Sequence, residues 1–369
     1  RIGMKPGGPA TYDARLDARL DAVMASGART FGSVLAAMLG ADPLAVAEQL
    51  RRRDVALDFA VSPWRPVRWR PQLHPAHAEW YFNRECAGAL AERFAGQSLL
   101  CLGAPTVAAA AGGTAVDRDP ALLRSRFGAQ LTAVVACDLG QTDAIPVPAG
   151  FDAVVIDPPW YAPHPLRWLA LGAAAVRPGG IVAMVVPGAL HRPTAELERH
   201  AVVTAAAALG PTRVEPQAVH YDTPGFEALA LRAASLAVPA VWRAADLVVT
   251  EVMRPAAVMV PPPVEVGAPA ESIVIGEQLV TLSSRERAGS PRLAPLPGTR
   301  DFRWDRISRR DPRVDDIDVW TSGSRVASVY GRPEVRRALL AIAAGAPPTE
   351  ATDHPELAGA LSSLLDQSG

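Results

Sequence analysis

Phe151-Asp152-Ala153-Val154-Val155-Ile156-Asp157-Pro158-Pro159-Trp160 is an apolar run closed by an acid, two prolines and a tryptophan. Valine and isoleucine favour strands, and a run without polar alternation predicts a strand that is buried on both faces. Proline has no amide hydrogen, so the strand is expected to end near Asp157. The stretch therefore predicts a central strand of a parallel α/β sheet, with Asp157 at its carboxyl end.

Apolar runs of the same kind precede and follow this strand, and helix-forming stretches separate them. We expect strands at 98–103, 114–117, 131–139 and 181–187, and helices at 106–111, 120–127, 165–176 and 194–209. Such alternation indicates a parallel sheet with helices on both faces. Two further extended segments, 213–221 and 228–234, predict a final hairpin that adds an antiparallel strand. The expected fold class is α/β, with a Rossmann-like seven-stranded sheet of the methyltransferase type.

The chain has 369 residues, more than the ~100 to 200 residues of one domain, and we expect three units. The first unit, 1–77, combines a winged-helix-like segment with a linker rich in proline, tryptophan and arginine. Its helices are predicted at 12–24, 30–39 and 44–53. Two interpretations stay open for it: binding of nucleic acid or another partner, and a helical cap on the next domain.

The second unit, 78–246, contains the α/β sheet, and the third, 247–369, is predicted to be a β-rich α+β domain of unknown role. Prolines interrupt the strand patterns of this third unit. Its strands are predicted at 272–283 and 317–330, and its helices at 335–343 and 356–365.

Composition restricts the compartment and the partners. The formal net charge is −1, which gives no support to strong electrostatic steering toward nucleic acid. Cys86, Cys101 and Cys137 form no Cys-x-x-Cys pair, which favours buried, reduced thiols. No apolar run reaches the ~18 residues of a membrane span, and no signal region is recognised. We therefore expect a cytoplasmic protein with no membrane or metal site, whose oligomeric state the sequence leaves open.

Three strand ends carry residues suited to a nucleoside cofactor. Ligands of open α/β sheets lie at the carboxyl ends of the strands. There, Asp117 is placed to accept both ribose hydroxyls, and Asp138 to accept from an adenine amine. Gly103 permits close backbone approach, while Pro105 removes an amide that a pyrophosphate needs. S-adenosyl-L-methionine has no phosphate, so it fits this loop better than a dinucleotide does. Each acid taken singly is also a common helix cap.

Asp157-Pro158-Pro159-Trp160 is the predicted catalytic motif, and Tyr161 follows it toward the substrate pocket. An amino nitrogen conjugated to a ring is a poor nucleophile until its lone pair is freed. The Asp157 carboxylate and the Pro158 carbonyl form an acceptor pair for the two amine hydrogens, and the prolines fix the carbonyl geometry. Trp160 is able to stack on a planar substrate or on a cation. The motif predicts transfer by orientation and electrostatics, without a covalent enzyme intermediate.

The sequence resembles the N6-adenine methyltransferase-like family, which also contains a eukaryotic elongation-factor lysine methyltransferase. The matching pieces cover about residues 77 to 235 and include Glu79-Trp80-Tyr81-Phe82, Leu102-Gly103-Ala104-Pro105-Thr106-Val107, Asp117 and Asp157 to Trp160. The resemblance implies cofactor contacts from Trp80 or Tyr81, from the Gly103-Ala104 loop, and from Asp117 and Asp138. It implies amine contacts from Asp157 to Trp160, and it leaves adenine and lysine equally open as acceptors.

Two alternatives to this N-methyltransferase hypothesis remain open. The helical start and the missing glycines are also compatible with a nucleic-acid-binding regulator that has a degenerate methyltransferase fold. A Rossmann core with Asp-Pro-Pro after a helical start is similar to the aminopropyltransferases that build branched polyamines. Those enzymes carry a run of acids after the first strand, whereas this chain has Ala104-Pro105-Thr106, which disfavours a polyamine.

Two further clusters lie outside the motif. The segment 220–227 includes Tyr221 and Phe226, which either shape the substrate pocket or simply connect two strands. Arginines and tryptophans at 301–325 form either a nucleic-acid surface or a solvated charged face. The second interpretation is favoured, because acids at 311, 315, 316 and 318 interleave with the arginines.

Overall fold

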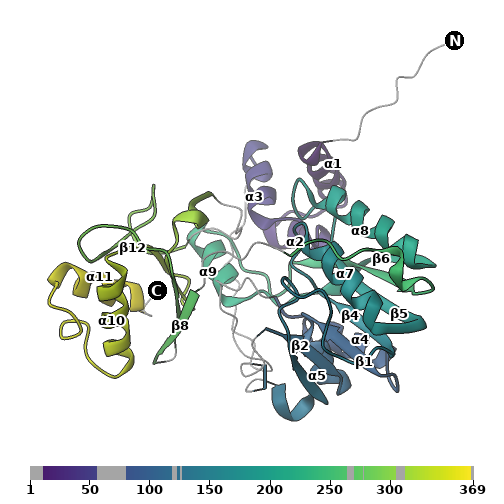
Figure 1. Ribbon diagram of the computed structural model, residues 1–369. Coiled ribbons are helices and arrows are strands. Elements are labelled where there is room, and N and C mark those ends of the chain that lie inside the picture. Colours follow the sequence, from purple (N-terminus) through teal and green to yellow (C-terminus); the bar gives the residue numbers. More distant parts are fainter. Residues whose placement is uncertain are drawn as a thin grey trace.

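The computed structural model describes residues 11–55, 80–118, 123–124, 127–263, 270–276, 278–304 and 312–366. Its main body is a seven-stranded sheet of order β3-β2-β1-β4-β5-β7-β6 (Figure 1). The strands are β1 (Leu99–Leu102), β2 (Thr114–Asp117), β3 (Ala133–Ala136), β4 (Phe151–Ile156), β5 (Val176–Pro187), β6 (Thr212–His220) and β7 (Ala244–Glu251). The first five run parallel, and β7 runs antiparallel between β5 and β6. The predicted seven-stranded Rossmann-like sheet is thus confirmed.

Helices cover both faces of this sheet, as the unalternating apolar strands require. They are α4 (Arg84–Arg93), α5 (Pro105–Ala111), α7 (His164–Ala175) and α8 (Ala195–Leu209). Successive residues of β1 point to opposite sides: Cys101 packs into one apolar cluster, and Leu100 and Leu102 into the other. Burial on both faces makes β1 and β4 a rigid platform for the residues that follow them.

Three N-terminal helices lie where the sequence predicts them: α1 (Tyr12–Ala25), α2 (Phe31–Ala37) and α3 (Pro43–Arg52). Their core continues into α9 (Gly225–Ala233), through Ala228 and Leu231. Gly40 donates a backbone hydrogen bond of 2.7 Å to the carbonyl of Trp242, just before β7. The helices therefore pack directly on the sheet domain. The predicted linker rich in proline, tryptophan and arginine, which ends at residue 77, lies outside the described residues.

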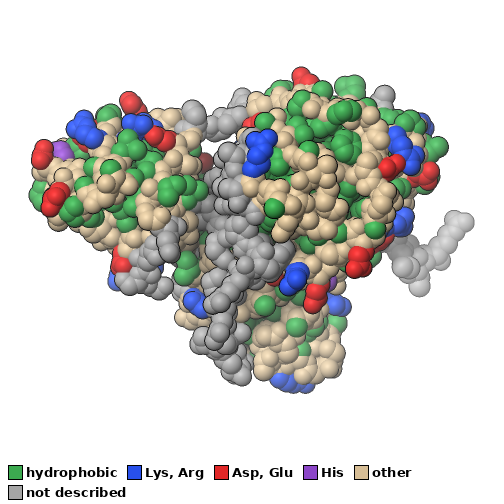
Figure 2. Space-filling view, turned by 90° about the horizontal axis from the view of Figure 1, so that it is seen from below, with side chains coloured by type: hydrophobic (Ala, Val, Ile, Leu, Met, Phe, Trp, Pro, Cys, Tyr) green, Lys and Arg blue, Asp and Glu red, His purple; other side chains and the backbone are tan. Residues whose placement is uncertain are grey.

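A second, five-stranded antiparallel sheet has the order β10-β12-β11-β9-β8 and stands beside the main body in Figure 1. Its strands are β8 (Ala270–Ile275), β9 (Gln278–Ser283), β10 (Arg292–Ala294), β11 (Val319–Thr321) and β12 (Val326–Tyr330). α10 (Arg332–Ala343) and α11 (Pro355–Leu365) share one apolar core with it. On the face shown in Figure 2, basic and acidic side chains are interspersed. Among the described residues, no helix is both long and apolar enough to cross a membrane.

The structure corrects the predicted hairpin. Residues 228–234 lie in and just after helix α9 rather than in a strand, and the partner of β6 is β7. Alanine, leucine and arginine, which dominate this stretch, are strong helix formers, and it contains no β-branched residue. β7 also continues to Glu251, five residues past the predicted domain boundary at 246.

Two predicted strands of the C-terminal domain each prove to be a hairpin. The run 272–283 divides into β8 and β9 around Gly276, and the run 317–330 contains β11 and β12 around Ser324. Both turn residues have positive φ, +56° and +59°. A positive φ reverses the chain locally, so one apolar run supplies two antiparallel strands.

Candidate functional site

Asp157 follows β4 directly, at the carboxyl edge of the parallel strands. Its backbone N–H donates to the carbonyl of Leu102, the last residue of β1, at 2.9 Å. Gly103 comes next, with φ of +69°, and a Cβ there would lie 2.4 Å from the Asp157 carbonyl oxygen. Only glycine fits both the backbone angle and the space. The end of β1 and the predicted catalytic motif are therefore in direct backbone contact.

Tyr221 holds the Asp157 carboxylate. Its hydroxyl, from the residue after β6, donates a hydrogen bond of 2.8 Å to Asp157 Oδ1. Burial raises the pKa of Asp157 to about 7, although hydrogen bonds to Tyr221 and Trp160 and the charge of Arg243 act to lower it. Burial and the neighbouring carboxylate also raise the pKa of Tyr221, so its hydroxyl stays protonated and donating. Asp157 is thus poised between its neutral and charged forms near neutral pH.

Residues 80–83, which precede α4, are fixed against the same strand end. Phe82 forms an isolated antiparallel bridge with Tyr221, and the Asn83 N–H donates to the His220 carbonyl at 2.9 Å. The Asn83 side chain then accepts from the Cys86 N–H and so caps α4. This pairing carries Trp80 and Tyr81 to the edge of the sheet where Asp157 lies.

Three tryptophans, Trp80, Trp160 and Trp242, surround the guanidinium of Arg243, and we refer to them as the tryptophan cage. The guanidinium carbon is 3.5 Å from the Trp80 ring centroid, 5.4 Å from that of Trp160 and 5.2 Å from that of Trp242. The Trp80 ring also meets Tyr221 and Phe226 edge-on, at 6.1 Å and 6.2 Å. The motif tryptophan and a fixed cation therefore belong to one aromatic cluster.

Glu227, in the first turn of α9, places its carboxyl group near the Arg243 guanidinium that the tryptophan cage surrounds. It is fully buried, and the distance from its Oε1 to Nη2 of Arg243 is 3.7 Å, too long for a hydrogen bond. Neither of its oxygens has a hydrogen-bond partner among the described residues. Burial raises the pKa of Glu227 well above its usual range, whereas the Arg243 pKa falls only to about 10. Arg243 therefore remains a cation at neutral pH.

The residues predicted to bind the cofactor lie along the ends of β1 to β3. Ala104 is buried and precedes α5. Asp117 is the last residue of β2 and is half-buried, and its carbonyl accepts from the Cys137 N–H at 2.9 Å. Asp138 follows two residues after β3, and its Oδ1 accepts from the Gly140 N–H at 2.8 Å. Asp138 thus caps its own turn, and it follows the strand that neighbours the strand of Asp117.

The aromatic residues predicted for the cofactor site and the substrate pocket lie in different surroundings. Trp80 lies under Arg243, whereas Tyr81 packs edge-on against Phe127, at 5.8 Å. Tyr161 is 44% exposed and contacts His164 rather than the tryptophan cage. Tyr221 and Phe226, by contrast, do lie at the cage.

Trp242 and Arg243 are functional candidates that sequence reasoning did not single out. They immediately precede β7, and the start of an antiparallel strand lies at the same sheet edge as the ends of its parallel neighbours. His191, also not singled out, follows β5 and stacks on Trp242, with 6.0 Å between centroids. Had β7 been predicted from the sequence, its start at this sheet edge would have indicated Trp242 and Arg243 as site residues.

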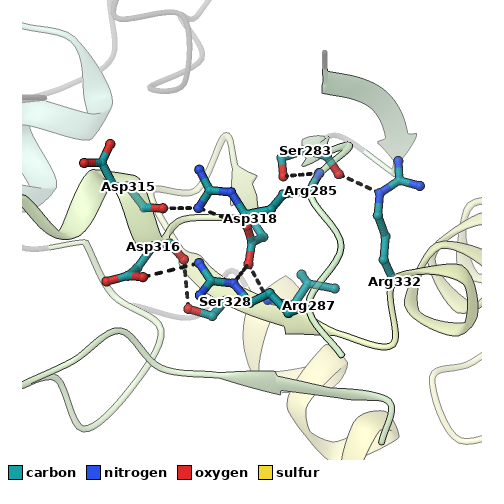
Figure 3. Close-up of polar contacts among 9 residues, drawn as sticks. Ser283, Arg285, Arg287, Asp315, Asp316, Asp318, Ser328 and Arg332 are labelled. Carbon is teal, nitrogen blue, oxygen red and sulfur yellow. Dashed lines mark hydrogen bonds and ion pairs between the residues drawn. The ribbon is translucent and has the colours of Figure 1, made fainter. Parts of the chain in front are cut away.

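The acids and arginines of the C-terminal domain form their own cluster (Figure 3). Asp318 is buried and accepts from Arg287 Nε at 2.6 Å and from the Val329 N–H at 2.9 Å. Arg285 approaches the other Asp318 oxygen at 3.5 Å, and Asp316 pairs with Arg287 at 3.3 Å. The acids at 316 and 318 therefore pair with arginines that precede the predicted cluster at 301–325, and Asp318 is buried rather than solvated.

Several solved structures share the fold. A branched-chain polyamine synthase from Thermus thermophilus, solved with N4-aminopropylspermidine and 5'-methylthioadenosine, is 15% identical, with a TM-score of 0.50 over 71% of this chain and 93% of that chain. A TehB-like SAM-dependent methyltransferase from Corynebacterium glutamicum is 14% identical, with a TM-score of 0.30 over 45% and 87% of the two chains. The N-methyltransferase NodS from Bradyrhizobium japonicum is 15% identical, with a TM-score of 0.30 over 47% and 97%.

No protein-family model matches the sequence, and no curated protein is significantly similar to it. The structural likeness at 15% identity concerns the fold. The function is therefore argued from the site itself.

Proposed function

We propose that this chain is an S-adenosylmethionine-dependent N-methyltransferase whose acceptor is an amino nitrogen, either adenine N6 in nucleic acid or a protein lysine. The observation that carries the proposal is Asp157 at the end of β4. It is bonded through its backbone to the cofactor-side strand β1 and through its carboxylate to Tyr221. One residue thus connects the expected cofactor loop to an aromatic acceptor pocket.

The residues present fit this cofactor. Gly103 leaves no side chain between the β1 loop and the motif, and Asp117 and Asp138 stand at the next two strand ends. Tyr81 is the better aromatic neighbour for it, because Arg243 already covers Trp80. S-adenosylmethionine, when bound, supplies the methyl group and leaves as a neutral thioether.

Asp157 has two tasks in the proposed reaction. Its carboxylate and the Pro158 carbonyl accept the amine hydrogens and so orient the nitrogen lone pair. With a pKa of about 7, Asp157 is also able to take up the proton that the nitrogen loses. Tyr221 keeps the carboxylate in place, and the Trp160 side chain also hydrogen-bonds to it.

The test has two steps. Isothermal titration calorimetry with S-adenosylmethionine comes first, and absence of binding at millimolar cofactor would sink the proposal. Labelled methyl transfer into fractionated RNA, DNA, protein and small molecules from a cell extract then identifies the acceptor. Asp157→Asn should abolish transfer and leave cofactor affinity nearly intact. Asp152→Asn, at the opposite end of the same strand, is the matched control and should retain transfer.

The alternatives make different predictions in the same assays. A nucleic-acid-binding regulator would bind RNA or DNA without transferring a methyl group. A polyamine enzyme would transfer an aminopropyl group to spermidine from the decarboxylated cofactor. Either result without methyl transfer would replace the proposed function.

A further inference from the structure

Arg243 is a buried cation beside the proposed acceptor site, and it lies outside the Asp157-to-Trp160 motif. Its guanidinium lies on the face of Trp80 and within 5.4 Å of the Trp160 ring centroid. Aromatic faces attract cations, and they are the surfaces on which an ammonium substrate would be held. In this chain, the Arg243 guanidinium already occupies the face of Trp80.

Arg243 is held more by stacking than by hydrogen bonds. Its Nε has no hydrogen-bond partner among the described residues, and the nearest oxygen of Glu227 is 3.7 Å away. Only 14% of its side chain is exposed, so water screens its charge weakly. The N-terminal domain adds to this environment, because Asp42, which caps α3, also contributes to the electrostatic surroundings of Arg243.

We propose that Arg243, seated in the tryptophan cage and backed by Glu227, is the specificity-determining residue of the acceptor site and excludes ammonium groups in favour of uncharged amines. A second cation next to the guanidinium would meet its repulsion where water screens charge weakly, and it would find the face of Trp80 covered. A neutral amine meets neither obstacle. This inference rests on the proposed function, since it concerns the amine that Asp157 receives.

Exclusion of ammonium groups agrees with the chemistry of methyl transfer. A protonated nitrogen has no free lone pair, so only the uncharged form can attack a methyl group. Protonated lysine side chains and protonated polyamines carry the excluded charge, whereas aromatic amines are neutral at physiological pH. The geometry therefore favours an aromatic amine as acceptor.

The experiment uses two probes of the same shape and different charge, benzylammonium and benzyl alcohol. Their affinities are measured by ligand-observed NMR titration of the full chain, with saturating S-adenosylhomocysteine present to keep them out of the cofactor site. Arg243→Met should tighten benzylammonium binding at least about tenfold and change benzyl alcohol binding by less than about twofold. The matched control Arg243→Lys keeps the charge and should continue to exclude benzylammonium.

Arg243→Met leaves the Glu227 carboxyl buried without the neighbouring cation and so endangers folding. The double variant Arg243→Met/Glu227→Gln replaces both ionisable side chains with neutral ones and should show the same gain for benzylammonium. An unchanged benzylammonium affinity in a folded variant would overturn the proposal. If neither variant folds, the wild-type protein decides, because binding of benzylammonium as tight as that of benzyl alcohol would overturn it as well.

These outcomes are separable from the proposed function. Failure to bind S-adenosylmethionine, measured by calorimetry on the same wild-type protein, overturns the methyltransferase assignment. The change in probe affinity between Arg243→Met and Arg243→Lys reports on charge selection alone.

Discussion

Removing the Tyr221 hydroxyl is the perturbation with the clearest expected consequence. Tyr221→Phe keeps the ring, and with it the contacts to Phe82 and Trp160 at centroid distances of 5.0 Å and 5.8 Å. It deletes only the 2.8 Å hydrogen bond to Asp157 Oδ1. Hydrogen bonds to charged groups contribute about 1.5 to 3 kcal/mol, and 1.36 kcal/mol corresponds to about one pKa unit. The Asp157 pKa should therefore rise from about 7 by roughly one to two units.

The assay is kcat/KM for labelled methyl transfer as a function of pH. Because Asp157 accepts the amine hydrogens as a carboxylate, activity in the wild type should rise as pH increases through about 7. In Tyr221→Phe the same rise should occur at higher pH. Activity at pH 7 should therefore fall roughly 5- to 50-fold and recover in alkaline buffer. Tyr330→Phe, in the C-terminal domain, is the control and should reproduce the wild-type profile.

The pH dependence of the free energy of unfolding tests the same hydrogen bond without a methyl acceptor. The folded-state pKa of Asp157, about 7, lies above its ordinary value of 3.8, so the folded state binds this proton more tightly than the unfolded state does. The contribution of Asp157 to the free energy of unfolding is thus full below about pH 4 and is lost as pH rises through about 7. In thermal melts of Tyr221→Phe, this contribution to the free energy of unfolding should therefore persist to higher pH than in the wild type. Superimposable activity and melting profiles for the two proteins would refute the role given to this hydrogen bond.

Three further substitutions test the cofactor loop, the second strand and the C-terminal domain. Gly103→Ala should lower the free energy of unfolding by at least about 1 to 3 kcal/mol and prevent cofactor binding, and an unchanged melting temperature would contradict the close approach to Asp157. Asp117→Asn should weaken S-adenosylmethionine binding at least about tenfold in calorimetry; equal affinity would remove Asp117 from the site. Asp318→Asn should destabilise the C-terminal domain by about 1 to 3 kcal/mol in thermal denaturation, because the hydrogen bond from Arg287 loses its charged acceptor, while cofactor affinity stays unchanged.

Much of the sheet was predictable because its signals are local. The apolar run 151–156 followed by Asp157-Pro158-Pro159 predicts both a buried strand and its end, and the structure has β4 over the same residues. The same holds for β1 and β2, whose short apolar runs end at Leu102 and Asp117. Their burial pattern depends on a few consecutive side chains, which a sequence displays directly.

The end of the sheet was not predictable in the same way. Residues 228–234 are apolar, and the sequence does not show what covers them. In the structure, Ala228 and Leu231 pack into the core of the N-terminal helices, which lie some 200 residues earlier in the chain. Helix propensity and this distant packing together make the segment α9, and the closing strand is the later β7.

The local pattern was thus enough to establish the α/β class, the succession of the parallel strands along the chain and the place of Asp157 at a strand end. Tertiary packing added the surroundings of that residue. Tyr221 reaches Asp157 because β6 and β4 end at one edge, and Arg243 reaches the tryptophan cage because β7 runs antiparallel. Asp157 and these two partners are 64 and 86 residues apart in the sequence. Their proximity depends on the direction of whole strands, a property that no single stretch of sequence contains.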